Sequence, residues 1–199
     1  NQPLVNSLVN CTSLTHIIFG IDFNQPLHNS LSNCTSLTNL TFGNRFNQPL
    51  HNSLSNCQSL THIKFGHDFN QPLFNLLNNC TSLIHLDLGY HFNKKDEIPF
   101  NIRSLKLDSN NRNYIDYLPA NIEELELGLN FNLELDNLPS TIKKISFNKS
   151  SDYDKELNCL PSGLLILKLP YDYDLQIKNI PKKLKKLICS KWWYEFINA

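Results

Sequence analysis

One short stretch recurs at a fixed step and constrains what this chain can fold into. Phe-Asn-Gln-Pro-Leu occurs at 23–27, 46–50 and 69–73, and the chain opens on a copy without its Phe at 1–4. The step is 23 residues each time. Self-similarity at such a period is the signature of a repeat protein, because so short a unit cannot bury an apolar face alone and must stack on its neighbours.

Each repeat contains a six-residue core that is apolar at its first, fourth and sixth positions, the L-x-x-L-x-L pattern of a leucine-rich repeat. Side chains alternate along a strand, so the fourth and sixth positions face one side and the fifth faces the other. We predict an α/β repeat solenoid, a leucine-rich-repeat-like right-handed horseshoe with one short parallel strand per repeat of 20–23 residues. Turns and short 3₁₀ segments should form its return side. The cores begin at Leu14, Leu37, Leu60, Leu83, Ile102, Ile122, Ile142, Leu164 and Leu184.

The repeats change type after residue 92. Residues 1–92 carry the 23-residue repeats, and residues 93–191 carry shorter repeats with a proline three residues before each core. We interpret 1–199 as a single solenoid domain with a joint at 94–97. The aromatic segment 192–199 should cap the end of the core, or alternatively bind a partner. The chain contains no Met, so we expect a fragment or a processed product. The prolines are Pro99, Pro119, Pro139, Pro161 and Pro181.

The charge balance excludes some classes of function. Lysine and arginine together number 18, as do aspartate and glutamate, so the formal net charge is zero. A general nucleic-acid or anionic-membrane binder would need an excess of basic residues. No run of about 18 apolar residues is present, so we expect no membrane span. We therefore predict no nucleic-acid partner and no membrane association.

Asparagine and glycine recur at fixed positions and should stack from coil to coil. Asparagine side chains can satisfy backbone groups in the turns of neighbouring coils, so we predict an asparagine ladder. A glycine follows each of the first four cores, where we expect a bend with positive φ. The ladder residues are Asn24, Asn47, Asn70 and Asn93, and the glycines are Gly20, Gly43, Gly66 and Gly89.

Four cysteines also recur every 23 residues, namely Cys11, Cys34, Cys57 and Cys80. Stacked side chains point in parallel, which is poor geometry for a disulfide and for a zinc site. We expect a ladder of buried, reduced thiols, which favours a reducing compartment and hence the cytoplasm. Sequons for N-glycosylation begin at Asn10, Asn33, Asn39, Asn79 and Asn148, so a glycosylated extracellular or surface protein is the alternative.

The polar strand positions should form the concave face of the solenoid. His16, His62 and His85 share the third core position, but Asn39 interrupts them, so we favour solvated contact residues over a metal site. Charges of opposite sign recur one coil apart in the later repeats, where they should pair and could also steer a partner. These charged residues are Arg103, Glu123 and Lys143, then Glu124 and Lys144, and finally Lys106 and Glu126.

The repeats at 14–27, 37–50 and 60–73 resemble the FNIP repeat, a leucine-rich-repeat relative found in amoebal and giant-virus proteins. The later repeats match its other half, and Phe131-Asn132 is a partial remnant of the signature. The spacer Asn-Cys-Thr-Ser-Leu is also similar to the repeats of BspA-like surface proteins. The FNIP resemblance implies a viral or amoebal protein, in host cytoplasm if viral. It also implies an F-box outside these residues, which would bind a ubiquitin-ligase adaptor.

No catalytic constellation is visible in the sequence. We find no nucleophile with a base, no paired carboxylates in a pocket and no phosphate-binding loop. We predict a non-enzymatic module, without cofactor or metal, that binds a protein partner on the concave face. It would act as the substrate-recognition part of an F-box-type ubiquitin-ligase adaptor. The alternative is a structural or surface protein that self-assembles through its solenoid ends.

Overall fold

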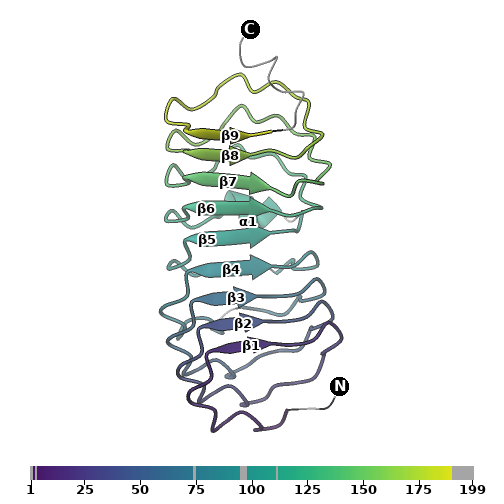
Figure 1. The fold of residues 1–199 in the computed structure, drawn as a ribbon, viewed down its shortest axis with the longest axis vertical. Coiled ribbons are helices and arrows are strands. Elements are labelled where there is room, and N and C mark those ends of the chain that lie inside the picture. The colour runs from purple at the N-terminus through teal and green to yellow at the C-terminus, as the bar shows by residue number, and fades with distance from the viewer. Residues whose placement is uncertain (1, 3, 74, 95–97, 111, 190–199) are drawn as a thin grey trace. The chain divides into compact units, whose positions relative to one another are not determined.

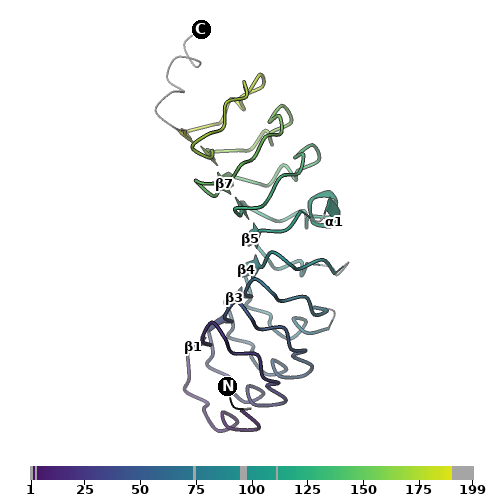
Figure 2. The same cartoon turned by 90° about the vertical axis from the view of Figure 1, so that its right-hand side faces the viewer.

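The computed structural model describes residues 2, 4–73, 75–94, 98–110 and 112–189. The chain divides into two compact units, 1–102 and 103–199 (Figures 1 and 2), and each is considered by itself. The boundary falls within ten residues of the change in repeat type. The interpretation as a single domain stays a prediction. Most of the expected joint, 95–97, and the expected aromatic cap, 192–199, lie outside the described residues.

The first unit is built on four short parallel strands, β1 (His16–Ile18), β2 (Asn39–Thr41), β3 (His62–Lys64) and β4 (His85–Leu88). They follow one another in chain order. Equivalent positions of successive repeats pair directly, as in Ile17 with Leu40 and Leu40 with Ile63. The register therefore equals the sequence period, so each residue type at a fixed repeat position becomes a column.

The second unit has the same construction, with strands β5 (Ser104–Leu107), β6 (Glu124–Leu127), β7 (Lys144–Phe147), β8 (Ile166–Lys168) and β9 (Lys186–Ile188). All of its strand pairs are parallel, and Figure 1 shows them stacked in chain order. The predicted fold class, a leucine-rich-repeat-like solenoid with one short parallel strand per repeat, is confirmed.

The return side contains one element that the sequence did not predict. A short helix, α1 (Arg112–Asp116), lies on the side of its coil away from β5 (Figure 2). It buries Tyr114 and Ile115, which are adjacent in sequence. An extended chain would turn one of two adjacent side chains outward. A helical turn is the local conformation that brings both into the core of this coil.

Two columns of phenylalanine rings run through the core of the first unit. Phe42 stacks on Phe19 and Phe65 with ring centroids 5.3 and 5.5 Å apart. The signature Phe of each repeat forms the second column, at steps of 6.1 to 6.2 Å. Within a coil the two rings lie closer, 4.2 Å apart for Phe42 and Phe46. Stacked aromatic pairs add to the stabilisation from burial, which explains why the signature keeps its Phe.

The second unit replaces this column with mixed aromatic residues. Phe131, Tyr153 and Tyr173 stack at 6.3 and 6.0 Å. Tyr173 donates its hydroxyl hydrogen to the Lys155 carbonyl at 3.1 Å, which satisfies a largely buried polar group. The second unit therefore keeps an aromatic residue at this position although it lacks the Phe-Asn-Gln-Pro-Leu motif.

The asparagine ladder connects the coils of the first unit on the return side. The amide N–H of Asn47 donates to Asn24 Oδ1 at 3.0 Å, that of Asn70 to Asn47 Oδ1 at 2.9 Å, and that of Asn93 to Asn70 Oδ1 at 3.1 Å. The glutamines that follow Asn47 and Asn70 add a second donor, since Gln48 Nε2 lies 3.0 Å from Asn24 Oδ1 and Gln71 Nε2 lies 3.0 Å from Asn47 Oδ1. Each carboxamide oxygen thus accepts hydrogen bonds from the next coil.

The ladder continues in the second unit, although the sequence pattern did not predict it there. The Asn132 N–H donates to Asn110 Oδ1 at 2.6 Å, and the Asp154 N–H donates to Asn132 Oδ1 at 3.2 Å. Asn132 follows the aromatic Phe131, as Asn24 follows Phe23. The Phe131-Asn132 dipeptide could have indicated that the ladder continues. Asn110 and Asp154 could not be aligned with it, because the later repeats have unequal lengths.

Gly43, Gly66 and Gly89 are required for the close approach of successive turns, and the expected positive φ is wrong. No described glycine has a positive φ. A Cβ on Gly66 would instead lie 2.0 Å from the carbonyl oxygen of Gly43 in the preceding coil. A Cβ on Gly20, in the first coil, would meet nothing within 4 Å. Stacking of one turn directly on the preceding turn therefore excludes a side chain at this position.

The turn that leads into each strand has the same hydrogen bond in both units, with cysteine as the acceptor residue in the first unit and proline in the second. The N–H of Leu60 donates to the Cys57 carbonyl at 3.1 Å, and the N–H of Ile122 donates to the Pro119 carbonyl at 3.2 Å. In both units the acceptor lies three residues before the first core position. The change of repeat type thus preserves the turn that enters the strand.

We expect Gly66→Ala to lower the free energy of unfolding by about 1–3 kcal/mol, because the new methyl group would overlap a backbone carbonyl. Gly20→Ala is the matched control, since its methyl group meets open space. Urea unfolding of both variants, followed by circular dichroism, measures the difference. Equal stability of the two variants would contradict the close-approach explanation.

Candidate functional site

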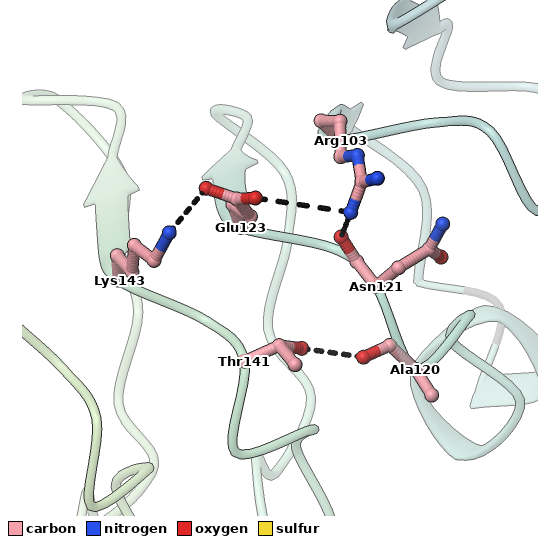
Figure 3. A network of polar contacts seen from close by, with 6 residues as sticks. All are labelled: Arg103, Ala120, Asn121, Glu123, Thr141 and Lys143. Carbon is pink, nitrogen blue, oxygen red and sulfur yellow. Dashed lines mark hydrogen bonds and ion pairs between the residues drawn. The ribbon is translucent and has the colours of Figure 1, made fainter.

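A row of exposed charges lies beside the strands of the second unit. The strands begin at Glu124 in β6 and Lys144 in β7, so Arg103, Glu123 and Lys143 each lie one residue before a strand. Figure 3 shows these three side chains in line, with Lys143 Nζ 2.6 Å from Glu123 Oε2 and Arg103 Nη1 3.8 Å from Glu123 Oε1. Three successive coils thus present alternating charges.

Backbone and side-chain hydrogen bonds hold this row in register (Figure 3). Arg103 Nη1 donates to the Asn121 carbonyl at 3.4 Å, and Thr141 Oγ1 donates to the Ala120 carbonyl at 2.6 Å. The Lys143 N–H donates to the Glu123 carbonyl at 2.8 Å. The hydrogen bond from Lys143, followed by its positive charge, lowers the pKa of the Glu123 carboxyl. Glu123 therefore carries its negative charge at neutral pH.

Two more ion pairs lie on the strands themselves. Lys144 Nζ lies 2.7 Å from Glu124 Oε2, and Lys106 Nζ lies 3.0 Å from Glu126 Oε1. Exposed pairs of this kind stabilise a fold by less than about 1 kcal/mol each. Their main effect is to fix the positions of charged groups on a surface, which gives a partner a defined electrostatic pattern.

The strand face of the first unit carries an ion pair, Lys64 with Asp87 at 3.9 Å, and a column of histidines. The rings of His62 and His85 stack with centroids 4.0 Å apart and an interplanar angle of 11°. Partial burial, and secondarily the neighbouring His85, lowers the pKa of His62. His16 lies opposite Asn39 in the register and is separated from the other two by β2. The three histidines thus share a column, but only two are in contact.

The cysteines stack on the return side of the first unit as free thiols. Cys34 donates to the Leu8 carbonyl at 3.5 Å, and Cys57 donates to the Leu31 carbonyl at 3.4 Å. Burial, followed by the neighbouring Cys80 and Cys34, raises the pKa of Cys57 to about 12. Burial also raises the pKa of Cys80 to about 12. Cys11 is only half-buried, whereas Cys34, Cys57 and Cys80 are buried.

These pKa values predict which cysteines react. The thiolate is the nucleophile, and at pH 9 a thiol with a pKa of about 12 is only about a thousandth ionised. We expect iodoacetamide at pH 9 to label the exposed Cys159 and to spare Cys57 and Cys80 in the folded protein. Residue-by-residue mass spectrometry measures the labelling, and labelling in urea is the control. Fast labelling of Cys57 in the folded protein would contradict a buried column.

No helix in the described part of the chain is both long and apolar enough to cross a membrane.

Comparisons with known proteins agree with the repeat architecture. The FNIP Repeat family model matches residues 23–57 and 111–150. The chain is similar to CroV588, described as a novel circular LRR protein, with a TM-score of 0.70 and 32% sequence identity over 89% of this chain. This chain covers 27% of the length of that protein. A search of curated proteins gives no match.

A second solved structure shows the fold alone. An internalin from Listeria monocytogenes has a TM-score of 0.57 and 16% sequence identity, over 94% of this chain and 58% of that chain. Its fold is similar although few residues are shared. The family-model matches show FNIP repeats in both units, and the parallel strand of every described repeat together with the two solved structures shows a leucine-rich-repeat-like fold.

Proposed function

We propose that this chain is a non-enzymatic module that binds a protein partner on its strand face. Leucine-rich-repeat-like folds are typical of protein–protein interaction modules, and their stacked strands supply extended binding surfaces. The observation that carries the proposal is the set of exposed charges that strand pairing holds in fixed columns. The two shortest ion pairs of this set are Lys143 with Glu123 at 2.6 Å and Lys144 with Glu124 at 2.7 Å.

The physical reason is that recognition needs a surface whose charges are already positioned. A flexible lysine loses rotamer freedom when a partner orders it, and this loss weakens binding. Pairing across coils restrains Lys143 and Lys144 before any partner arrives. Pre-positioned charges also raise the rate of encounter with a partner of complementary pattern.

We extend this proposal to the substrate-recognition part of an F-box-type ubiquitin-ligase adaptor. This role is only what the resemblance to FNIP-repeat proteins implies, since members of that family often carry an F-box. The F-box would lie elsewhere in the whole protein. Such a module would work in the cytoplasm, and the buried free thiols are compatible with a reducing compartment.

Self-assembly through a solenoid end is the second candidate. A second copy could add its coils to the stack, because parallel pairing between strands of two chains would repeat the pairing that joins successive coils within one chain. Light scattering after gel filtration measures this directly, because assembly predicts a mass that rises with concentration.

The binding experiment uses a charge swap that preserves the ion pair. Glu124→Lys with Lys144→Glu keeps the pair between coils and the net charge but inverts the pattern on the strand face. We expect a partner captured by the wild-type chain from amoebal cytosol to bind this variant at least about tenfold more weakly, since like charges would then meet across the interface. Quantitative mass spectrometry of the captured proteins measures the loss.

The matched control swaps an ion pair outside the strand face. Asp22 and Arg45 lie 3.1 Å apart in the turns after β1 and β2. Asp22→Arg with Arg45→Asp should leave capture unchanged. Equal capture by both swapped variants would contradict binding at the strand face. Recovery of ubiquitin-ligase subunits with the whole gene product would support the adaptor role, and capture of the chain alone would support self-assembly.

A further inference from the structure

Two turns of the first unit bring together three side chains that can bind a metal. His67 and Asp68 lie in the turn after β3, and His91 lies in the turn after β4. One ligand atom from each of them lies within 4.8 Å of the other two. His67 Nδ1 is 2.8 Å from Asp68 Oδ1. The rings of His67 and His91 meet edge to face, with centroids 4.7 Å apart.

Stacking of the coils creates this cluster. Asp68 and His91 occupy the same position in successive repeats. Asp22 and Arg45 occupy that position in the first two coils and contact each other at 3.1 Å, so the position brings side chains of adjacent coils together. The His91 N–H donates to the His67 carbonyl at 3.0 Å, which joins the two turns directly.

A neighbouring ring restrains the histidines. Tyr90 stacks on His67 with centroids 5.1 Å apart and meets His91 edge-on at 4.9 Å. Both imidazoles therefore have a packed neighbour although they are exposed. A restrained ring loses less conformational freedom when it binds an ion.

We propose that His67, Asp68 and His91 form a binding site for a divalent transition metal such as Zn²⁺. Imidazole and carboxylate are both zinc ligands, at about 2.0–2.2 Å, and tetrahedral geometry at that length separates ligand atoms by about 3.3 Å. His67 and Asp68 are already at this spacing or closer. The ligand atom of His91 lies within 4.8 Å of the other two, so its exposed ring has to turn towards them to reach the tetrahedral spacing. Water completes the fourth position, as in other sites with three protein ligands.

The histidine column on the strands cannot form such a site. The parallel rings of His62 and His85 are stacked at 4.0 Å, and stacked rings direct their nitrogen lone pairs side by side and not towards one point. The sequence pattern indicated no metal site in that column. The turn cluster could not be predicted from sequence, because the other repeats carry Ile21, Asp22, Asn44 and Arg45 at these positions and the cluster therefore has no periodic signal.

The repeats themselves supply the test variants. His67→Asn and His91→Arg introduce the residues of the preceding coils, Asn44 and Arg45, and each removes one ligand. His85→Asn is the matched control, since Asn39 occupies that position in β2. Untagged full chain is treated with a chelator, dialysed and titrated with Zn²⁺ by calorimetry.

We expect the wild-type chain and His85→Asn to bind one Zn²⁺ with the same affinity. Loss of a ligand should weaken binding at least about tenfold in His67→Asn and His91→Arg, since even the loss of an outer-shell contact costs that much. Melting temperatures in chelator check that all four proteins are folded. The proposal is overturned if all four proteins bind Zn²⁺ with equal affinity. It is also overturned if His85→Asn loses as much Zn²⁺ affinity as His67→Asn and His91→Arg do.

The free cysteines are the competing ligands, and Co²⁺ distinguishes them. Thiolates bound to Co²⁺ give an intense near-ultraviolet charge-transfer band, which nitrogen and oxygen ligands lack. We expect a Co²⁺ complex with visible bands alone, and none of these bands in His91→Arg. A charge-transfer band that persists in His91→Arg would assign the metal to thiols and overturn the proposal.

Discussion

The hydrogen bond from a backbone amide to the asparagine carboxamide of the preceding coil is the interaction on which the first unit depends. Its three links measure 3.0, 2.9 and 3.1 Å, and they occur in turns where no strand pairing is available. The links at Asn47 and Asn70 are partly buried, so an unsatisfied donor there would carry a desolvation cost. By fixing the distance between turns, the ladder allows the Phe rings to stack at about 6 Å and requires glycine where Gly66 meets Gly43.

The surface follows from the same stacking. Because the register of the strands equals the repeat period, a residue type at one strand position becomes a column on one face. In the second unit the columns alternate in charge, and Glu123 lies between Lys143 and Arg103. In the first unit one such column places the ring of His62 against the ring of His85. Turn residues follow the same rule, which brings His91 onto the turn of Asp68. Binding chemistry on this scaffold therefore depends on which residues occupy equivalent positions.

The sequence predicted what recurs and failed where recurrence stops. In the first unit the strands, the apolar core and the residues of the ladder recur every 23 residues, so their stacking could be predicted. The role of Gly66 was predicted for the wrong reason, because sequence shows where glycine occurs but not how closely two turns approach. The helix α1 depends on Tyr114 and Ile115, a pair that a single repeat contains. The cluster at His67 uses residues from two repeats only and carries no periodic signal.

The most direct test of the ladder is the stability of Asn47→Ala. Asn47 Oδ1 accepts hydrogen bonds from the Asn70 N–H at 2.9 Å and from Gln71 Nε2 at 3.0 Å, so its removal leaves two donors without this acceptor. The free energy of unfolding in urea should fall by about 1–3 kcal/mol. Asn52→Ala, at an exposed position of the same coil, should change it by less than about 0.5 kcal/mol. Equal stability of the two variants would contradict a structural role for the ladder.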